Sequence, residues 1–282
     1  MRWRMRLRRS GRLFVGLRSR DGVADLPVVE MNRMPDIRMV QSGRDWTWRT
    51  SELILQVSEQ AIRDHGRCLL ALSGGSTPKA LYEAWSHPDW KQRFDWDRVV
   101  FLFGDERCVP PSHPESNYAM AEAALFHPLG IRSDSIYRME GEREDPTAAA
   151  RDYEARLRTL TMSAVPDFPQ VDLILLGLGD DGHTASLFPA TEALRDRIHA
   201  VAVGHAPRGV PLRLTLTLSV INRATVVLFL VTGAGKASVA RAVLEPRTVD
   251  EQSLPAGMVK PEAGRLIWML DHAAASQLRG GH

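Results

Sequence analysis

Two short segments carry the residue types needed to bind a phosphate group and to move a proton. In the first, residues 70–80 (LALSGGSTPKA), an apolar run is followed by the small residues SGGST at 73–77 and then by Pro78. This order indicates a strand, a glycine turn and a helix start, with Thr77 as the N-cap and Pro78 at the first helical position. The free N–H groups of such a turn bind anions, most often phosphate. Because the Gly-x-x-x-x-Gly-Lys-Ser/Thr spacing of ATP-binding loops is missing, the phosphate is predicted to belong to a small metabolite.

The second segment, residues 177–183 (GLGDDGH), places a histidine beside carboxylates at the end of another apolar run. An imidazole titrates near neutral pH, so His183 next to Asp181 is a candidate general base. The spacing also matches the G-x-G-x-x-G turn of dinucleotide-binding proteins. We exclude that function because Asp180 and Asp181 would repel a pyrophosphate and Pro189 leaves little room for the crossover helix. An Asp-x-His pair could bind a metal, but further ligands are not found nearby in the sequence, so neither a metal nor a cofactor is predicted.

Three further charged groups follow apolar runs. Residues 104–107 (GDER) bring Asp105 and Arg107 to the end of one such run. Arg107 could pair with an acid, hold a ligand or stabilise an oxyanion. Arg213 opens the alternating segment RLTLT, and Lys236 lies in TGAGKA before a predicted helix. Two cations at strand ends would complement the amides of the glycine turn around a phosphate dianion.

The elements that must position these residues alternate regularly along the chain. Apolar residues at helical spacing predict helices at 50–64, 78–85, 117–125 and 146–161. A further helix is predicted after TGAGK, ending at residue 244, and a short one at the C-terminus. Apolar runs typical of strands occur at 67–72, 99–103, 136–139, 171–176, 200–203, 213–218, 225–231 and 265–270. This alternation predicts an α/β fold, a doubly wound, mostly parallel Rossmann-like sheet with helices on both faces. Ligands of such sheets bind beyond the carboxyl ends of the strands, so the charged segments are predicted to form one composite site.

The composition is that of a globular protein, but the charge is unevenly distributed. The chain has 282 residues, of which 44% are apolar and 25% charged, and its only cysteines are Cys68 and Cys108. Two cysteines indicate a reduced, cytoplasmic protein, and no apolar stretch approaches the roughly 20 residues that span a bilayer. Residues 1–20 hold eight of the 36 basic side chains and no acid, which leaves 28 basic against 34 acidic residues elsewhere. The remainder offers no obvious basic face, so neither a nucleic acid nor a membrane is expected as a partner.

Residues 1–35 differ from the rest of the chain. They are rich in arginine and poor in acids, a composition that is also typical of transit peptides. We instead expect a disordered extension, or a start codon assigned too early with Met31 or Met34 as the true start. Residues 36–282 are predicted to form a single α/β domain that acts as a monomer or a small homo-oligomer.

Five stretches together resemble the 6-phosphogluconolactonases, in the superfamily that includes the glucosamine-6-phosphate deaminases. They are LALSGGSTPKALYEAW (70–85), FLFGDERCVPPSHPESNYAMA (101–121), VDLILLGLGDDGHTASLFP (171–189), RLTLTLSVIN (213–222) and VTGAGKA (231–237). They occur in the family's order and are specific only in combination. The resemblance implies hydrolysis of 6-phospho-D-glucono-1,5-lactone to 6-phospho-D-gluconate, the second step of the oxidative pentose phosphate pathway.

The resemblance also implies roles for individual residues. His183 would activate a water molecule, with Asp181 orienting either the imidazole or the substrate hydroxyls. Asp105 and Arg107 would line the sugar end, where Arg107 could polarise the lactone carbonyl. The phosphate cradle would comprise Ser73, Gly74, Gly75, Ser76, Thr77, Arg213 and Lys236. Since a lactone is already activated, the serines are expected to hold phosphate rather than to act as nucleophiles.

Two rival functions follow from the same resemblance. The deaminases use a glutamate five residues after the loop histidine, where this chain has Phe188, a residue that cannot transfer a proton. GDER and the stretch that follows it also resemble the lactonases rather than the deaminases. The fold further serves as a sugar-phosphate sensor in transcription regulators, but residues 1–35 lack the length and periodicity of a helix-turn-helix module. A lactonase is therefore expected.

Overall fold

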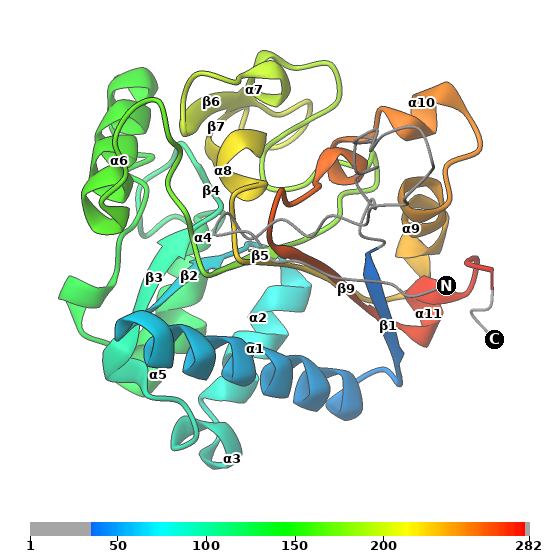
Figure 1. Ribbon diagram of the computed structural model, residues 1–282, viewed down its shortest axis with the longest axis horizontal. Helices are drawn as coiled ribbons and strands as arrows, with labels where there is room; N and C mark the ends of the chain where they lie inside the picture. Colours follow the sequence, from blue (N-terminus) through cyan, green and yellow to red (C-terminus); the bar gives the residue numbers. More distant parts are fainter. Residues whose placement is uncertain (1–34, 280–282) are drawn as a thin grey trace, which may run out of the picture. The chain divides into compact units, whose positions relative to one another are not determined.

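Six parallel strands form the larger of two sheets, in the spatial order β1-β9-β8-β5-β2-β3 (Figure 1). The computed structural model describes residues 35–279, so the predicted extension falls almost entirely outside the described residues. The strands are β1 (Asp36–Val40), β2 (Cys68–Leu72), β3 (Val99–Phe103), β5 (Leu173–Leu176), β8 (Val226–Val231) and β9 (Arg265–Asp271). Every residue of β2, β5 and β8 is buried, which explains why their sequences are continuously apolar instead of alternating.

The direction in which the chain adds strands reverses between β2 and β5. From β2 the chain moves outward to β3, and it then returns to the other side of β2 to add β5 and β8. In open α/β sheets ligands bind at the carboxyl ends of the strands where this reversal occurs. The α/β, mostly parallel sheet predicted from the sequence is therefore confirmed, and its reversal point lies between the two glycine-rich segments.

Two long helices, α1 (Arg44–His65) and α2 (Ser76–Trp85), lie on one side of the large sheet (Figure 1). The indole N–H of Trp46 in α1 donates to the carbonyl of Met269 in β9 at 3.3 Å. The indole N–H of Trp85 in α2 donates to Ser51 Oγ of α1 at 2.9 Å. Helix α1 begins before the predicted residue 50 because Trp46 adds a further buried anchor to its apolar face.

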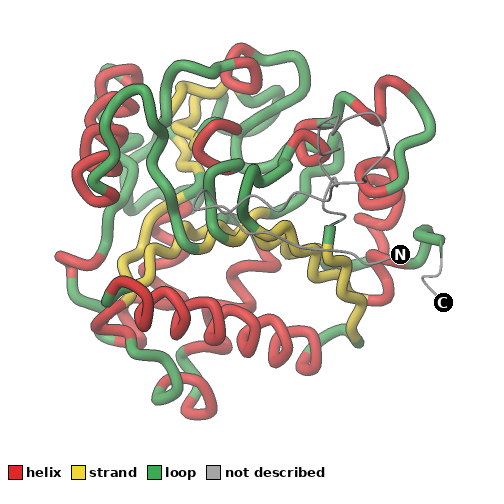
Figure 2. The backbone as a smooth tube through the Cα atoms, viewed as in Figure 1, coloured by secondary structure: helices red, strands yellow, loops and turns green. Residues whose placement is uncertain are grey.

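Short helices and loops make up most of the chain on the opposite side of the large sheet (Figure 2). The remaining helical elements are α3 (Pro88–Lys91), η1 (Trp96–Arg98), α4 (Asn117–Ala121), η2 (Glu122–Phe126), α5 (His127–Leu129), η3 (Ser133–Ser135), α6 (Pro146–Thr161), α7 (Glu192–Arg195), α8 (Leu218–Ile221), η4 (Ala234–Lys236), α9 (Ala237–Leu244), α10 (Val249–Gln252), η5 (Pro255–Met258) and α11 (His272–Ala275). The predicted strand at 136–139 is wrong, because only Ile136 bridges to Phe101 before the chain turns away from β3.

A second, antiparallel sheet carries part of the composite site. Its strands lie in the order β4 (Asp105–Arg107), β7 (Leu212–Leu216) and β6 (Val201–His205). The GDER segment therefore continues into a short strand, with Asp105 opposite Thr215 and Arg107 opposite Arg213. A strand of three charged residues has no apolar pattern of its own, so only its pairing with β7 reveals it.

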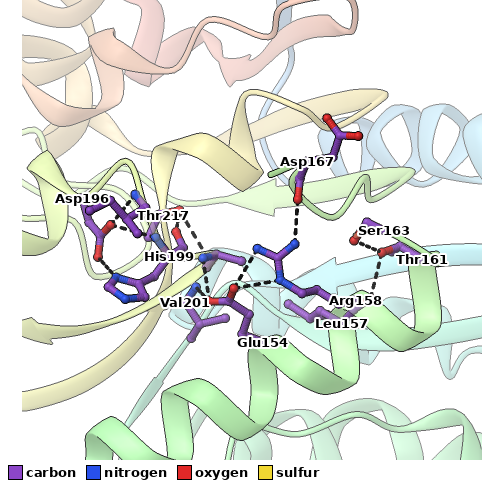
Figure 3. Close-up of polar contacts among 12 residues, drawn as sticks. Glu154, Leu157, Arg158, Thr161, Ser163, Asp167, Asp196, His199, Val201 and Thr217 are labelled. Atoms are coloured by element: carbon purple, nitrogen blue, oxygen red, sulfur yellow. Dashed lines mark hydrogen bonds and ion pairs between the residues drawn. The ribbon is translucent and has the colours of Figure 1, made fainter. Parts of the chain in front are cut away.

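Helix α6 is tied to the small sheet by partly buried charges (Figure 3). Glu154 Oε2 accepts the N–H of Ala200 at 2.8 Å, just before β6. Its other oxygen lies 2.8 Å from Arg158 Nη2, and the two side chains are only 16% and 15% exposed. Arg158 Nη1 also donates to the carbonyl of Asp167 at 2.6 Å. Both charges thus have protein partners.

The turn before β6 is closed by a second carboxylate of the same region (Figure 3). Asp196 accepts hydrogen bonds from the N–H groups of Ile198 and His199 at 2.8 and 2.9 Å, and from His199 Nδ1 at 2.8 Å. Thr217 Oγ1 in turn donates to the carbonyl of His199 at 2.8 Å. We refer to Glu154, Arg158, Asp196 and His199 as the α6 network.

Candidate active site

The carboxyl ends of four neighbouring strands, β3, β2, β5 and β8, open onto one cavity of about 770 Å³. The hairpin between β6 and β7 also contributes to its wall. Nine of the residues predicted from the sequence line this cavity: Ser73, Gly74, Gly75, Asp105, Arg107, Asp181, His183, Arg213 and Lys236. Segments as far apart in the chain as Ser73 and Lys236 thus meet at one edge of the sheet, as the parallel topology requires.

The turn after β2 lines the cavity and is held in place by Tyr82 of helix α2. The buried Tyr82 hydroxyl accepts the N–H of Ser73 and donates to its carbonyl, both at 3.0 Å, and burial raises the pKa of Tyr82. Gly74 has no space for a side chain, because a Cβ there would lie 2.0 Å from Asn117 Oδ1. Gly75 has a φ of +103°, a conformation that favours glycine. Both glycines are therefore required by the shape of the turn.

The start of helix α2 differs from the prediction. Gly75 and not Thr77 is the N-cap, no side chain caps the helix, and Pro78 is its third residue. Thr77 Oγ1 instead lies 2.8 Å from Thr232 Oγ1 in the loop after β8. Ser76 is exposed, and neither it nor Thr77 lines the cavity. Because helix geometry leaves the first N–H groups without carbonyl partners, these two residues can offer backbone donors rather than hydroxyl groups.

His183 is held on three sides. Its Nδ1 lies 2.5 Å from Asp181 Oδ1, and its ring packs against Phe188 with centroids 4.3 Å apart. On the third side the ring lies against the backbone of Gly179. A side chain there would collide with the ring, because a Cβ at Gly179 would lie 2.0 Å from His183 Nδ1. The imidazole remains 31% exposed, toward the cavity that it lines. Its orientation is therefore fixed while Nε2 is left for a reactant.

Asp181 is kept ionised by the histidine it orients. Burial by itself would raise the pKa of Asp181, but hydrogen bonds from the His183 side chain and from the His183 N–H at 3.1 Å outweigh burial and lower it. Gly182, with a φ of +76°, donates to the carbonyl of Gly179 at 3.0 Å and closes the loop. Carboxylate and imidazole are thus presented by one rigid turn.

Asp105 lies at the base of the cavity and connects three loops. It is 7% exposed and accepts hydrogen bonds from Ser186 Oγ at 2.7 Å and from Asn117 Nδ2 at 3.2 Å. The same amide donates to the Asp105 carbonyl at 2.9 Å, while its oxygen faces Gly74. Asn117 thereby sets the distance between the glycine turn and Asp105. It was not among the predicted site residues, although Ser-Asn at a helix start directly after GDER is a signal that could have indicated it.

The two acids of GDER have different surroundings. Glu106 is 3% exposed and does not line the cavity. Its carboxylate accepts the N–H groups of Arg107, Asn117 and Tyr118 at 2.7, 2.7 and 2.8 Å, and Ser116 Oγ at 2.9 Å. Glu106 therefore caps the start of α4 and fixes the strand end, while Asp105 faces the cavity.

Two arginines face each other across β4 and β7. Arg107 Nη1 donates to the carbonyl of Glu115, and its buried Nε has no hydrogen-bond partner within residues 35–279. Arg213 is 8% exposed and donates from Nε to the carbonyl of Val210 at 2.8 Å. Burial lowers the pKa of Arg213, and the neighbouring charge of Arg107 lowers it further. Asp105, Glu115 and Glu106 act on that pKa in the opposite direction. Like charges directly opposite each other in a sheet are destabilising, and an anion between them would relieve this repulsion.

Lys236 approaches the cavity from the turn after β8. Its Nζ lies 2.6 Å from Asp180 Oδ1 in the loop that carries His183. Arg208, in the hairpin between β6 and β7, adds a further cation to the cavity wall and was also missed from the sequence. Its signal was only its position, a few residues before Arg213 in a segment rich in proline and glycine.

Within the described part of the chain, His, Cys, Asp and Glu side chains do not gather in groups of three or more that could hold a metal ion. A helix long and apolar enough to cross a bilayer is likewise not found among residues 35–279.

Comparison with known proteins decides the family. The sequence model of the family described as glucosamine-6-phosphate isomerases/6-phosphogluconolactonase matches residues 43–268. The chain belongs to this family. It is 42% identical over 230 residues to a 6-phosphogluconolactonase of a Nostoc species, covering 82% of this chain and 92% of the relative. It is 44% identical over 220 residues to the Synechocystis enzyme of that name, covering 78% and 88%.

Solved structures of the family agree with the fold. A 6-phosphogluconolactonase from Trypanosoma cruzi superimposes with a TM-score of 0.77 at 28% identity, covering 88% of this chain and 98% of that one. A monomeric glucosamine-6-phosphate deaminase gives a TM-score of 0.69 at 21% identity, covering 86% and 99%. Both branches of the family thus share the backbone, and the side chains around His183 must distinguish them.

Proposed function

We propose that this chain hydrolyses 6-phospho-D-glucono-1,5-lactone to 6-phospho-D-gluconate in the oxidative pentose phosphate pathway. The observation that carries the proposal is that an oriented histidine and two facing arginines share one cavity. The first supplies a base for water, and the second supplies charge for a phosphorylated ester. The 6-phosphogluconolactonases among the relatives, which this chain matches over most of its length, support the same assignment.

The phosphate binds where cations and backbone donors converge. Arg213 and Lys236 supply charge, and the turn at Gly74 and Gly75 supplies N–H groups. Ser73 lines the cavity beside them, but its own N–H is bound by Tyr82. Neither Ser76 nor Thr77 lines the cavity, so we assign neither hydroxyl group to the phosphate, and the start of α2 adds only the positive end of its dipole. The remaining sugar hydroxyls then lie toward Asp105, at the base of the cavity.

Hydrolysis requires one proton acceptor and one oxyanion partner. Nδ1–H of His183 is held by Asp181, so Nε2 accepts a proton from water while the water oxygen adds to the lactone carbonyl carbon. The carbonyl becomes an oxyanion, which the guanidinium group of Arg107, a residue that lines the cavity, stabilises. The C1–O5 bond then breaks, and the proton on His183 passes to the departing ring oxygen. A positioned base contributes roughly 10²–10⁴-fold, and an oxyanion donor adds about 10²–10³-fold.

Deamination of glucosamine 6-phosphate is the main alternative. That reaction needs a further acid near the imidazole, in the place where Phe188 packs on His183 at 4.3 Å. A phenyl ring neither donates nor accepts a proton, which favours the lactonase. A sugar-phosphate sensor would bind the same ligands but would have no need for the Asp181–His183 pair.

The test is hydrolysis of freshly prepared 6-phosphogluconolactone at slightly acidic pH, where spontaneous opening is slow. Wild type and His183→Gln are compared, with glucosamine 6-phosphate assayed in parallel. Fast lactone hydrolysis that is lost in the variant supports the proposal. Ammonia release from the amino sugar would instead indicate the deaminase, and inactivity toward both substrates would favour a sensor.

Three further expectations remain predictions. They are a cytoplasmic location, a monomer or small homo-oligomer, and a single catalytic domain over residues 36–282.

A further inference from the structure

Lys236, a proposed phosphate ligand, already has an anionic partner in the protein. Its Nζ lies 2.6 Å from Asp180 Oδ1. The Asp180 side chain is 88% exposed and that of Lys236 is 31% exposed. Both line the cavity. The exposed carboxylate of Asp180 therefore contacts the ammonium group of Lys236 inside the cavity that an arriving ligand must enter.

The backbone around Asp180 does not depend on this ion pair. Gly179 N–H donates to the carbonyl of His183 at 2.9 Å, and Gly182 N–H donates to the carbonyl of Gly179 at 3.0 Å. The carbonyl of Gly182 in turn accepts the N–H of Ala256 at 3.0 Å. Because these bonds close the loop on themselves, the Asp180 side chain can rotate into solvent while His183 stays in place.

A carboxylate and a phosphate dianion cannot share one ammonium group without repelling each other. We propose that Asp180 is an internal competitor for the substrate phosphate, which must displace it from Lys236. The identity of that phosphate rests on the proposed function. The free-energy cost of displacement is the same for every ligand that contacts Lys236. It therefore weakens the binding of the phosphorylated substrate and of the phosphorylated product equally. Ligands without a phosphate are unaffected, and product release becomes faster.

The opposite role for Asp180 predicts the opposite sign. If Asp180 served to hold Lys236 in position for the phosphate, removing its charge would weaken phosphate binding. Competition predicts that the same change strengthens it. The direction of the effect therefore decides between them.

The experiment is calorimetric titration of the full chain with inorganic phosphate, 6-phosphogluconate and gluconate. We expect Asp180→Asn to lower the Kd of both phosphate-containing ligands by about two- to five-fold, the range of an exposed ion pair. The Kd of gluconate should not change. Asp180→Ser should give the same result, which guards against a new contact made by the asparagine.

Glu83→Gln is the matched control. Glu83 lies 3.8 Å from Lys79 on helix α2, so this variant also removes one negative charge from a lysine pair near the glycine turn. Neither residue lines the cavity. We expect no change in phosphate affinity, because only general electrostatics is altered. An equal gain in Glu83→Gln and Asp180→Asn would overturn the proposal.

Dependence on Lys236 completes the test. In a Lys236→Gln background, Asp180→Asn should give no further gain, since the contact between the two residues is already lost. A gain that persists, unchanged affinity in Asp180→Asn, or weaker binding would each overturn the competition. If the wild type binds phosphate as described but does not hydrolyse the lactone, the proposed function fails and the competition stands. If the wild type hydrolyses the lactone and Asp180→Asn binds phosphate as the wild type does, the proposed function stands and the competition fails.

Discussion

The α6 network and the cavity both gather several charges, but they arrange them differently. The network sets opposite charges against each other, whereas the cavity, beside its Lys236–Asp180 pair, sets two arginines opposite each other. Glu154 and Arg158 contact each other at 2.8 Å, and each has a further backbone partner. In the cavity Arg107 faces Arg213, and the Nε of Arg107 lacks a partner within the described residues. Opposite charges in contact serve the fold, whereas two arginines placed opposite each other, even with Asp105 and Glu115 nearby, indicate a ligand.

Both regions are built on the same small sheet. Glu154 is bound to the chain just before β6, and Arg213 lies in the neighbouring strand β7. The satisfied network therefore anchors the sheet on one side while the other side keeps two like charges close together. Functional sites commonly retain such local destabilisation by like charges when the surrounding structure is stable enough.

The largest expected effect is on stability, from Glu154→Ala. The change leaves Arg158, which is 15% exposed, without its carboxylate and removes the acceptor of the Ala200 N–H. We expect the free energy of unfolding to fall by about 3 kcal/mol. Denaturant unfolding measures this, and kcat/KM should stay within two-fold of the wild type, about the scatter of such assays. A large loss of kcat/KM with unchanged stability would contradict the assignment of this network to the fold.

The converse is expected from Arg213→Met, which keeps much of the side-chain volume and removes the charge. The affinity for 6-phosphogluconate should fall by about 100-fold, as for a buried charged contact. The Tm should change little, because the lost repulsion from Arg107 offsets the lost hydrogen bond to Val210 and the lost attraction to Asp105. Arg213→Lys serves as the control that keeps the charge. The comparison of the two regions breaks if Arg213→Met unfolds more easily and still binds the product normally.

Phe188→Leu tests the packing that orients the base. Without the phenyl ring, whose centroid lies 4.3 Å from that of the imidazole, the imidazole gains freedom, and kcat should fall by about ten-fold with KM unchanged. Phe188→Tyr should restore most of the rate, because it keeps the aromatic face. Steady-state kinetics distinguishes this positioning role from a binding role, which would raise KM instead.

The smallest effect is expected for Asp196→Asn and depends on pH. Burial raises the pKa of Asp196, but hydrogen bonds from the N–H groups of His199 and Ile198 and from the His199 ring outweigh burial, so its pKa is lowered. Its stabilising effect is therefore present above the unfolded pKa near 4 and is lost as the pH falls through the lower folded value. We expect the variant to lose about 1 kcal/mol at pH 7. Thermal unfolding at pH 7 and pH 3 checks this, and a difference that grows toward low pH would contradict it.

The regular elements were largely predictable because their signals are local. Helix α6 (Pro146–Thr161) and strand β3 (Val99–Phe103) have the predicted bounds, since a proline start and an unbroken apolar run depend on neighbouring residues only. Strand β1 was missed because half-exposed side chains such as Ile37 give no continuous apolar pattern. The N-cap at Gly75 was also missed, because Thr77 contacts Thr232, a residue far along the chain.

Local sequence patterns were enough to indicate which chemical groups the protein contains: a glycine turn, a histidine beside an acid, and cations at strand ends. How these groups meet depends on the tertiary fold. The pairing of β4 with β7 sets Arg107 against Arg213, Asn117 spaces Gly74 from Asp105, and Asp180 takes the cation predicted for phosphate. These contacts join segments that are distant in the chain, so strand order and packing determine them and local propensity does not.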